Sequence, residues 1–216
     1  MNIILFGPPG AGKGTQANNI EKIFKSHKVS TGDLLRKEIK YNTDLGAKIK
    51  PILEKGSLVS DDIINNVIVK ILSDKTFYNR LVFDGYPRNL SQAKNLDLLL
   101  KKFNQKVSCV FNLNASKELI IKRILGRQTC SNCGLIFNKH FKPATNKNHT
   151  CDPKFLGKRS DDNESAINNR FETYLAKTLP ILNFYKQQNL LHQINGLAEI
   201  DQIFKEIRDI IATLEA

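Results

Sequence analysis

Residues 3–15 read IILFGPPGAGKGT, and this stretch decides the fold. Its first four residues are apolar and predict a buried strand, and helix-compatible sequence follows the last. The glycines between them let backbone N–H groups turn inward around an anion, and the helix N-terminus adds its partial positive charge. Lys13 supplies a full charge for outer phosphates. The alternative is an ordinary glycine turn, but such a turn needs neither a strand before it nor a helix after it. The stretch therefore predicts nucleotide binding.

Position 14 departs from the common form of such loops. Many carry a Ser or Thr there that binds Mg²⁺, whereas this chain has Gly14 and places its hydroxyl one residue later, at Thr15. A direct Ser/Thr ligand is therefore not expected, and another group must help to position the metal.

Length and composition suit one α/β core with an inserted subdomain. The chain has 216 residues, of which 41% are hydrophobic and 25% charged. No apolar run approaches the ~18 residues that span a bilayer, and the N-terminus itself reads as the first strand, so neither membrane insertion nor a signal peptide is expected. The chain is expected to be intracellular, and there the four cysteines favour metal binding over disulfides.

The net charge is +12, from 33 Lys and Arg against 21 Asp and Glu. Strong basicity is typical of nucleic-acid-binding proteins, but here the lysines are scattered and no run of five or six basic residues occurs. A basic surface also suits small phosphate-rich substrates. We therefore expect no direct nucleic-acid function.

Apolar strands alternate with helices along the chain, which is the pattern of a parallel sheet with helices on both faces. Beyond the first strand, strands are expected at 27–30, 81–84, 107–113 and 190–195. Helices are expected after the caps Ser60 and Ser116 and at 91–103, 163–185 (broken at Pro180) and 199–214. Residues 126–161 break the alternation. They are polar and lysine-rich and hold three of the cysteines, which predicts a small ordered subdomain.

Asp84 ends an apolar strand and is followed by Gly85, Tyr86, Pro87 and Arg88. A carboxylate at the carboxyl end of a central strand faces the same crevice as the glycine loop, where an Asp that organises Mg²⁺ is needed. Arg88 then brings a bidentate phosphate binder into that crevice. The alternative is a turn Asp at a strand end with an Arg in solvent.

Arginines supply most of the expected phosphate-binding charge. Singly, each is more often a solvated surface charge, but around a phosphate loop the set matches two nucleotides and their transition state. The set comprises Arg36, Arg88, Arg123, Arg127, Arg159 and Arg170. No general base stands out. This fits an acceptor that is itself a phosphate, because its oxygen is already anionic and needs only charge and alignment.

These motifs resemble, in order and over nearly the whole chain, those of adenylate kinases of the bacterial long-lid type. The resemblance is carried by 7–16, 30–33 with Arg36, 84–88 with Gln92, 126–127, Arg159 with 161–162, and Arg170. The Asp-Gly-Tyr-Pro-Arg string at 84–88 is the most specific of them. The resemblance implies an α/β fold with a parallel five-stranded P-loop core (1–29, 60–125 and 164–216). It also implies an AMP-binding insertion at 30–59 and a lid at 126–163.

The resemblance also implies the reaction ATP + AMP ⇌ 2 ADP with Mg²⁺, by a cytoplasmic monomer of AMP salvage without nucleic-acid or membrane partners. The catalytic residues that it implies are Lys13, Asp84 (acting on Mg²⁺ through water), Arg88, Arg123, Arg127, Arg159 and Arg170. Those for ATP are Gly10, Ala11, Gly12, Lys13, Gly14, Thr15, Arg123, Arg127, Ile136, Phe137 and Ala198. Those for AMP are Thr31, Arg36, Ser57, Leu58, Val59, Gly85, Tyr86, Pro87, Arg88, Gln92, Arg159 and Arg170.

Three cysteines of the lid segment have the spacing of zinc ligands. Cys130 and Cys133 form a knuckle and Cys151 follows, which is a good but incomplete tetrahedral set for a structural Zn²⁺. In the family that the chain resembles, the fourth ligand comes three residues after the third. This chain has Lys154 there, and a cation does not ligate readily.

The fourth zinc ligand is therefore open. Asp152, His149 and His140 are the candidates, with Asp152 or His149 favoured. The alternative is a lid without metal, held by packing and hydrogen bonds. Cys109 lies in an apolar strand and is expected to be a buried hydrophobic residue.

Two other functions compete with this interpretation. A kinase for another nucleoside monophosphate, such as UMP or CMP, is the nearer one, but Thr31 and Gln92 fit the adenine-selecting positions of the family and favour AMP. A zinc-ribbon nucleic-acid-binding module would use the cysteines and the charge. It leaves the glycine loop and Asp84 unexplained, and the chain lacks the interleaved aromatic residues of common RNA-binding modules.

Overall fold

A computed structural model describes residues 1–215 and contains a five-stranded parallel sheet. The strands lie in the order β2-β3-β1-β4-β8. Their bounds are Asn2–Phe6 (β1), His27–Ser30 (β2), Leu81–Asp84 (β3), Val107–Asn114 (β4) and Leu191–Asn195 (β8). The predicted parallel sheet is confirmed, and each strand lies within one residue of its expected bounds.

Strand periodicity divides the apolar core into two layers. In β1, Ile3 and Leu5 belong to one layer, and Ile4 and Phe6 belong to the other, because successive side chains point to opposite faces. All four side chains are at most 3% exposed. The sheet is therefore covered on both sides, as the continuous apolar strands predict.

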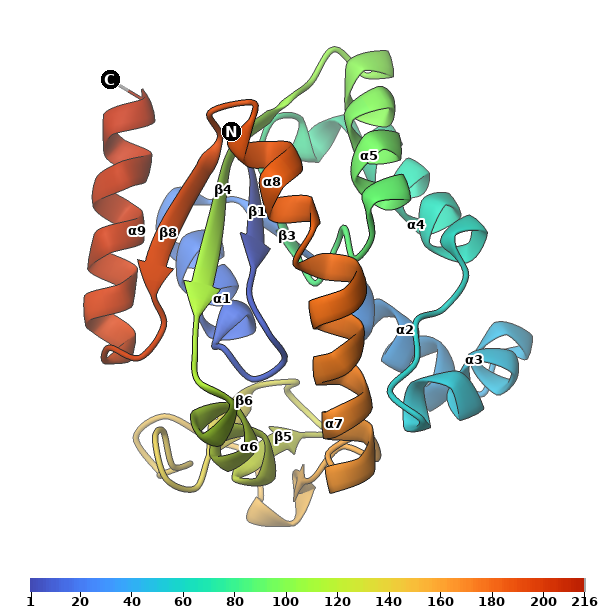
Figure 1. Cartoon of the computed structure of the whole chain (residues 1–216). Coiled ribbons are helices and arrows are strands. Elements are labelled where there is room, and N and C mark those ends of the chain that lie inside the picture. Colours follow the sequence, from blue (N-terminus) through green and yellow to red (C-terminus); the bar gives the residue numbers. More distant parts are fainter. Residues whose placement is uncertain (216) are drawn as a thin grey trace.

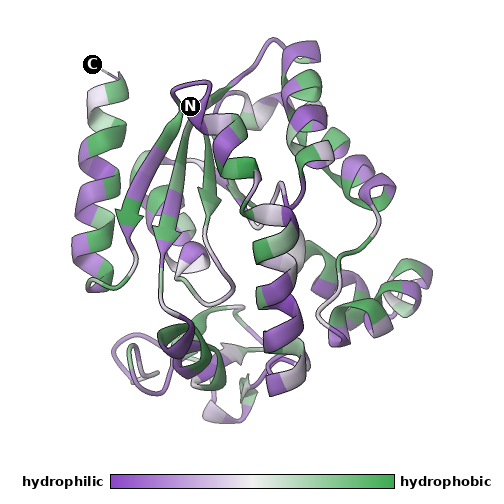
Figure 2. Cartoon of the chain, viewed as in Figure 1, coloured by the Kyte–Doolittle hydropathy of each residue, from purple (hydrophilic) through white to green (hydrophobic). Residues whose placement is uncertain are grey.

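Helices cover both faces of the sheet (Figure 1). One face carries α1 (Lys13–Phe24) and α9 (Ile200–Glu215), and the other carries α4 (Asp61–Ser73), α5 (Leu90–Lys102) and α8 (Ile181–Lys186). Hydrophobic and hydrophilic residues alternate along α9 in Figure 2. Its buried residues recur every fourth position, at Ile203, Ile207 and Ile211, which places one stripe of the helix on the core.

Polar side chains begin several of the helices. Ser116 accepts a hydrogen bond from the Leu119 N–H at 3.4 Å at the start of α6 (Lys117–Leu125), as expected. Ser60 precedes α4 as predicted, but within the described chain its side chain makes no capping bond. Acidic residues in the first turn of α4, Asp61 and Asp62, complement the helix dipole instead.

The long helix expected at 163–185 is interrupted. It consists of α7 (Glu164–Thr173), a π-helical turn (Tyr174–Thr178) and α8, with Pro180 at the break. Proline has no N–H to donate to the preceding turn and its ring clashes with it, so the break at Pro180 is confirmed.

Two segments leave the core at its carboxyl edge. After β2 the chain forms α2 (Thr31–Lys40) and α3 (Asp44–Glu54). After α6 it forms a small antiparallel sheet of order β6-β5-β7, made of β5 (Arg127–Cys130), β6 (Ile136–Asn138) and β7 (Leu156–Gly157). The two segments touch, because Lys40 Nζ donates to the Ser131 carbonyl at 2.9 Å.

Short 3₁₀ turns at Lys75–Phe77 and Pro153–Phe155 complete the regular structure. Cys109 is fully buried in β4, as expected, and burial raises the pKa of its thiol to about 12. Among residues 1–215, no helix has both the length and the apolar character required to cross a bilayer.

Candidate active site

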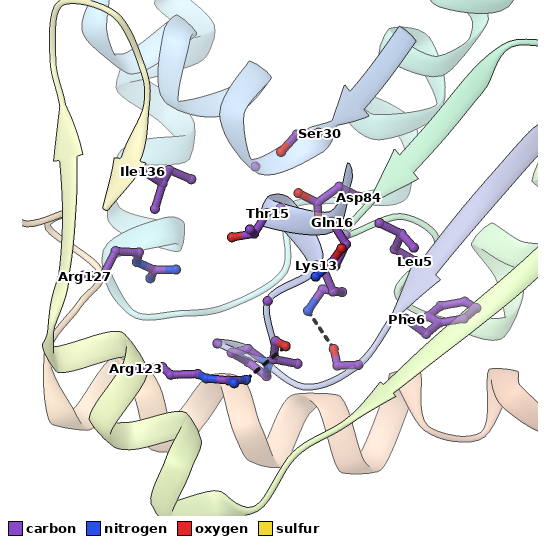
Figure 3. Close-up of a pocket in the computed structure, with 18 of the residues that line it drawn as sticks. Leu5, Phe6, Lys13, Thr15, Gln16, Ser30, Asp84, Arg123, Arg127 and Ile136 are labelled. Carbon is purple, nitrogen blue, oxygen red and sulfur yellow. Dashed lines mark hydrogen bonds between the residues drawn. The ribbon is translucent and has the colours of Figure 1, made fainter. Parts of the chain in front are cut away.

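The glycine loop joins the carboxyl end of β1 to the N-terminus of α1. Gly12 is the N-cap residue of α1 and has a left-handed backbone with φ +102°, which glycine adopts without steric cost. Lys13 Nζ donates to the carbonyls of Gly7 at 2.7 Å and Pro8 at 2.8 Å, and Figure 3 marks one of these bonds. The ammonium group is thus held over its own loop, where an anion would meet it.

Burial and neighbouring arginines destabilise the charged form of the Lys13 side chain. Desolvation lowers its pKa to about 8 against the opposing influence of Asp84, and Arg88 and Arg170 add to the decrease. A bound polyphosphate would reverse this effect, because negative charge favours the protonated form.

A cavity of about 290 Å³ opens beside the loop, and the predicted cationic side chains line it. Its lining combines the loop with α2, the end of β3, α6, the small sheet and α7. It includes Lys13 and all six predicted arginines: Arg36, Arg88, Arg123, Arg127, Arg159 and Arg170. The remaining lining residues that the sequence predicted are Gly10, Ala11, Gly12, Gly14, Thr15, Leu58, Asp84, Gly85, Pro87, Ile136, Phe137 and Ala198.

A second, smaller cavity adjoins the first through shared residues at Leu58, Gly85 and Arg88. It takes in the other residues predicted for AMP, which are Thr31, Val59, Tyr86 and Gln92. Its other walls are apolar, from Leu35, Leu53 and Ile64. Of the predicted AMP set, Ser57 lines neither cavity within the described chain.

Carboxylates hold two of the arginines in place. Arg127 Nε donates to Asp162 Oδ2 at 2.8 Å, and Arg170 Nη1 donates to Asp161 Oδ2 at the same distance. The Asp162 side chain is 0% exposed, so this pair is shielded from solvent. Burial alone would lower the pKa of Arg127, but the bond to Asp162 raises it above its usual value. The motif at 161–162 therefore orients guanidinium groups towards the cavity.

Arg159 is the least satisfied cation of the cavity. Its side chain is 11% exposed, and its Nη2 lies 3.5 Å from Asp33 Oδ1. Its Nε is buried and finds no hydrogen-bond partner among the described residues. Burial and the nearby guanidinium of Arg36 lower the pKa of Arg159. An unpaired buried donor is costly, so the group is poised to receive an anion.

Arg123 lines the cavity beside the glycine loop. Its Nη1 donates to the carbonyls of Ala11 at 3.2 Å and Gly196 at 3.0 Å, and Figure 3 shows Arg123 and Arg127 directed towards the loop. The guanidinium carbon lies 5.5 Å from the ring centre of Phe141. Phe141 was missed by sequence reasoning because it lies in the aperiodic polar stretch. It makes this end of the cavity suited to a flat ring.

The carboxylate of Asp84 approaches the loop closely at position 14. A Cβ on Gly14 would lie 3.2 Å from Asp84 Oδ2, so glycine makes room for this approach. Asp33 lies nearby and binds Arg36 Nη2 through Oδ1 at 2.5 Å. Burial would raise the pKa of Asp33, but the charges of Arg36, Lys28 and Arg159 and the bond from Arg36 together hold that pKa well below its usual range. Carboxylate oxygens are the ligands that Mg²⁺ prefers, so this pair fits the metal.

Lys28 of β2 lies next to the carboxylates of Asp33 and Asp84. Its Nζ lies 3.5 Å from Asp33 Oδ2 and 3.9 Å from Asp84 Oδ2, and it donates to Asn18 Oδ1 at 2.9 Å. Sequence reasoning did not find Lys28, because one lysine among 33 basic residues carries no signal of its own. The lysine balances two carboxylates that would otherwise repel each other.

The cavity offers no obvious proton acceptor. In the part of the chain that the structure describes, no histidine lines it. Its carboxylates are Asp33, Asp84 and Glu199. The first two are paired with cations, and the negative charge of Glu199 acts on the Arg123 guanidinium, where it opposes the lowering of the Arg123 pKa by burial. The geometry therefore suits transfer to an acceptor that is already anionic.

A second constellation lies in segment 126–163. The ligand atoms of Cys130, Cys133, His149 and Cys151 all lie within 4.8 Å of one another. His149 Nε2 is buried and has no hydrogen-bond partner within residues 1–215. Three thiols and an imidazole form a donor set that suits Zn²⁺. The cluster thus adds a fourth donor to the three predicted cysteines.

The other two candidates for the fourth ligand lie outside this cluster. Asp152 turns towards Lys154, whose Nζ lies 3.1 Å from Asp152 Oδ2. His140 is exposed, and its backbone N–H donates to Asn138 Oδ1 at 2.9 Å. The sequence signal for the fourth donor is a histidine two residues before the last cysteine.

Comparison with known proteins agrees with the geometry. The family model for adenylate kinase matches residues 5–190. The chain is 45% identical to an adenylate kinase of Pelagibacter ubique over 211 residues, which are 98% of this chain and 99% of that protein. It is 39% identical to one of Enterococcus faecalis over 98% of this chain and 99% of that one, and 35% identical to one of Archaeoglobus fulgidus over the full length of both. The chain therefore belongs to the adenylate kinase family, the phosphotransferases that interconvert ATP plus AMP and two ADP.

Proposed function

We propose that the two adjoining cavities hold ATP and AMP at the same time, in one chain. The observation that carries this proposal is that the glycine loop, Lys13 with the six predicted arginines, and the small Thr31–Gln92 cavity adjoin one another around one space. The ATP phosphates lie on 10–15 in this assignment, and the adenine ring of ATP lies against Arg123 at the end of the cavity near Phe141. AMP places its phosphate near Arg36 and Arg88 and its base against the residues of the small cavity, which at about 20 Å³ must widen to admit a purine.

The chemistry is then alignment and charge neutralisation. The attacking oxygen of AMP is anionic and needs no base, so the barrier falls mainly through positive charge placed around the transferred phosphoryl group. Lys13 and Arg123 serve the donor side, and Arg88 serves the acceptor side. Arg127, Arg159 and Arg170 close on the transferring group from segments 126–163 and α7. We assign 126–163 as the lid, 30–59 as the AMP-binding insertion and the rest as the core.

Magnesium accompanies ATP in this family, and it neutralises phosphate charge when bound. Asp84 and Asp33 are the residues that would hold its water ligands. Gly14 supports this role, since it leaves the Asp84 carboxylate free to approach the loop. Lys28 keeps both carboxylates paired before the nucleotide arrives.

The acceptor assignment is tested by turnover with different nucleoside monophosphates. We expect ADP formation from ATP and AMP to exceed product formation with UMP, CMP or GMP by at least ~10²-fold in kcat/KM, because a pocket that hydrogen-bonds one base rejects others strongly. A coupled assay with each acceptor at equal concentration measures this. Equal turnover with a pyrimidine acceptor would contradict the assignment.

We also propose a structural Zn²⁺ in the lid, bound by Cys130, Cys133, His149 and Cys151. The support is the convergence of the four donor atoms and the unpaired, buried Nε2 of His149. The metal would link the turn at Cys130 and Cys133 to the later stretch that holds His149 and Cys151. It takes no part in the transfer, because the cluster is separate from the residues that line the cavity.

Metal analysis tests the zinc site. Protein purified without chelator is expected to hold about one Zn²⁺ per chain, and His149→Ala or Cys151→Ser is expected to lose it. Loss of a metal that binds only the folded state lowers the thermal midpoint by about 5–10 °C in a chain of this size. His140→Ala and Asp152→Asn are the matched controls and retain the metal. Wild-type protein without zinc would refute the site.

The protein is proposed to act as a cytoplasmic monomer in AMP salvage. The support for a monomer is that one chain supplies the loop, the arginines and both cavities. No residue of a second copy is needed to complete the site.

A further inference from the structure

Gln92 lines the small cavity with its amide already held at both ends. The backbone N–H of Arg88 donates to Gln92 Oε1 at 2.7 Å, and Gln92 Nε2 donates to Asp61 Oδ1, also at 2.7 Å. Gln92 is 3% exposed, so water does not compete strongly for these bonds. Asp61 is fixed in turn by Asn89 Nδ2, which lies 3.0 Å from Oδ1 and 3.3 Å from Oδ2.

These partners determine which way the amide faces. A backbone N–H can only donate, so the atom opposite Arg88 must be the amide oxygen. A carboxylate only accepts, so the atom opposite Asp61 must be the amide nitrogen. Rotating the amide by half a turn would set donor against donor at Arg88 and acceptor against acceptor at Asp61. The orientation therefore follows from chemistry, and one carbonyl lone pair and one N–H stay free for a ligand.

The fixed orientation bears on which purine the cavity accepts. Adenine carries a 6-amino donor beside ring-nitrogen acceptors. An amide pairs with adenine in two places: the amide oxygen accepts from the 6-amino group, and the amide N–H donates to a ring nitrogen. Hypoxanthine and guanine carry a 6-oxo acceptor instead, which would face the amide oxygen of Gln92. To bind a 6-oxopurine, the amide would have to turn against both of its partners.

We propose that Asp61 is a positioning residue for base selection, which holds Gln92 in the orientation that accepts 6-aminopurines and rejects 6-oxopurines. This proposal rests on the assignment of the AMP base to the small cavity. Asp61 was not among the residues that the sequence indicated. Its position at the start of α4, 31 residues before Gln92, gives no local sign of the contact.

The test compares AMP with IMP, because AMP carries a 6-amino donor on its base and IMP carries a 6-oxo acceptor at the same position. In Asp61→Ala the acceptor for Gln92 Nε2 is lost and the amide can turn. We expect the AMP-to-IMP ratio of kcat/KM to fall by about tenfold, the size of one charge-assisted hydrogen bond. The inhibition constant of IMP against AMP should fall with it. Asp61→Asn keeps a carbonyl oxygen for Gln92 and should retain most of the preference.

Asp62→Ala is the matched control, because Asp62 is the exposed neighbour in the same first turn of α4 and carries the same charge. It should leave the ratio unchanged. An equal loss of AMP and IMP turnover in Asp61→Ala would overturn the proposal and leave Asp61 a structural residue.

Two further outcomes separate this proposal from the assignment beneath it. Gln92→Leu should abolish the preference for AMP over IMP. If it does not, the placement of the base in the small cavity is wrong, whatever Asp61 does. If Gln92→Leu abolishes the preference but Asp61→Ala keeps it, only the role of Asp61 is wrong.

Discussion

The variant Lys13→Met is expected to lose on the order of 10³-fold or more in kcat, the scale of removing one cation from a phosphoryl-transfer site. Methionine keeps the length and most of the volume of the side chain but removes the charge from the glycine loop. Steady-state rates at saturating ATP and AMP measure the loss. Lys22→Met, at an exposed position of the same helix, is the control and should keep wild-type turnover.

Stability separates this catalytic loss from unfolding. The folded-state pKa of Lys13 lies at about 8, below that of a free lysine. Protonated Lys13 therefore costs folding free energy fully at pH values below 8, and this cost shrinks as the pH rises from 8 towards 10.5. At pH 7 the Lys13→Met protein should melt no lower than wild type. A large drop in its melting temperature would attribute the lost activity to the fold.

The lowered pKa of Lys13 also predicts that ATP binding is linked to proton uptake. Near pH 9 the free enzyme holds Lys13 mostly neutral, and ATP phosphates draw the proton back. ATP binding should therefore take up a proton, and ATP affinity should fall as the pH rises above 8. Titration calorimetry in two buffers of different ionisation enthalpy measures the uptake. An uptake of the same size in Lys13→Met would show that another group is responsible.

The variant Arg88→Lys is expected to lose about 10²–10³-fold in kcat/KM for AMP. Arg88 lines both cavities, and its Nε donates to the Gly85 carbonyl at 2.6 Å, which aims the guanidinium. Lysine retains the charge but not the planar, bidentate group that matches a phosphate. The backbone N–H that holds Gln92 is kept, so base selection should survive while phosphate binding fails.

Arg80→Lys supplies the comparison for Arg88, since Arg80 is exposed and its guanidinium donates to the Thr76 carbonyl at 2.6 Å. Its kinetics should match wild type. If Arg88→Lys kept wild-type kcat/KM for AMP, the phosphate of AMP would not bind at this position and the acceptor half of the site would need to be reassigned.

The sequence by itself determined the sheet, the glycine loop and the string from Asp84 to Arg88. The apolar runs of the central strands β1, β3 and β4 predict strands directly, because a strand buried on both faces has few polar positions. Loop glycines and Lys13 act through contacts within a few residues of one another. Local order along the chain therefore carries all the information that these features need.

Only the tertiary structure decided how distant side chains pair. It set Asp162 against Arg127, Lys28 between Asp33 and Asp84, and Asp61 against Gln92. A sequence pattern tells which face of an element is apolar, but the distance between two polar atoms depends on how whole elements pack.

Segment 126–163 shows the same division between what the sequence predicts and what packing decides. Spacing alone identified Cys130, Cys133 and Cys151, because two of them share a tight turn. Folding of the aperiodic stretch between them brought His149 to the three thiols and turned Asp152 to Lys154. Residues that act through neighbours in the chain were thus determined by the sequence. Residues that act across the fold were decided by packing, since no local pattern records a contact made between separate elements.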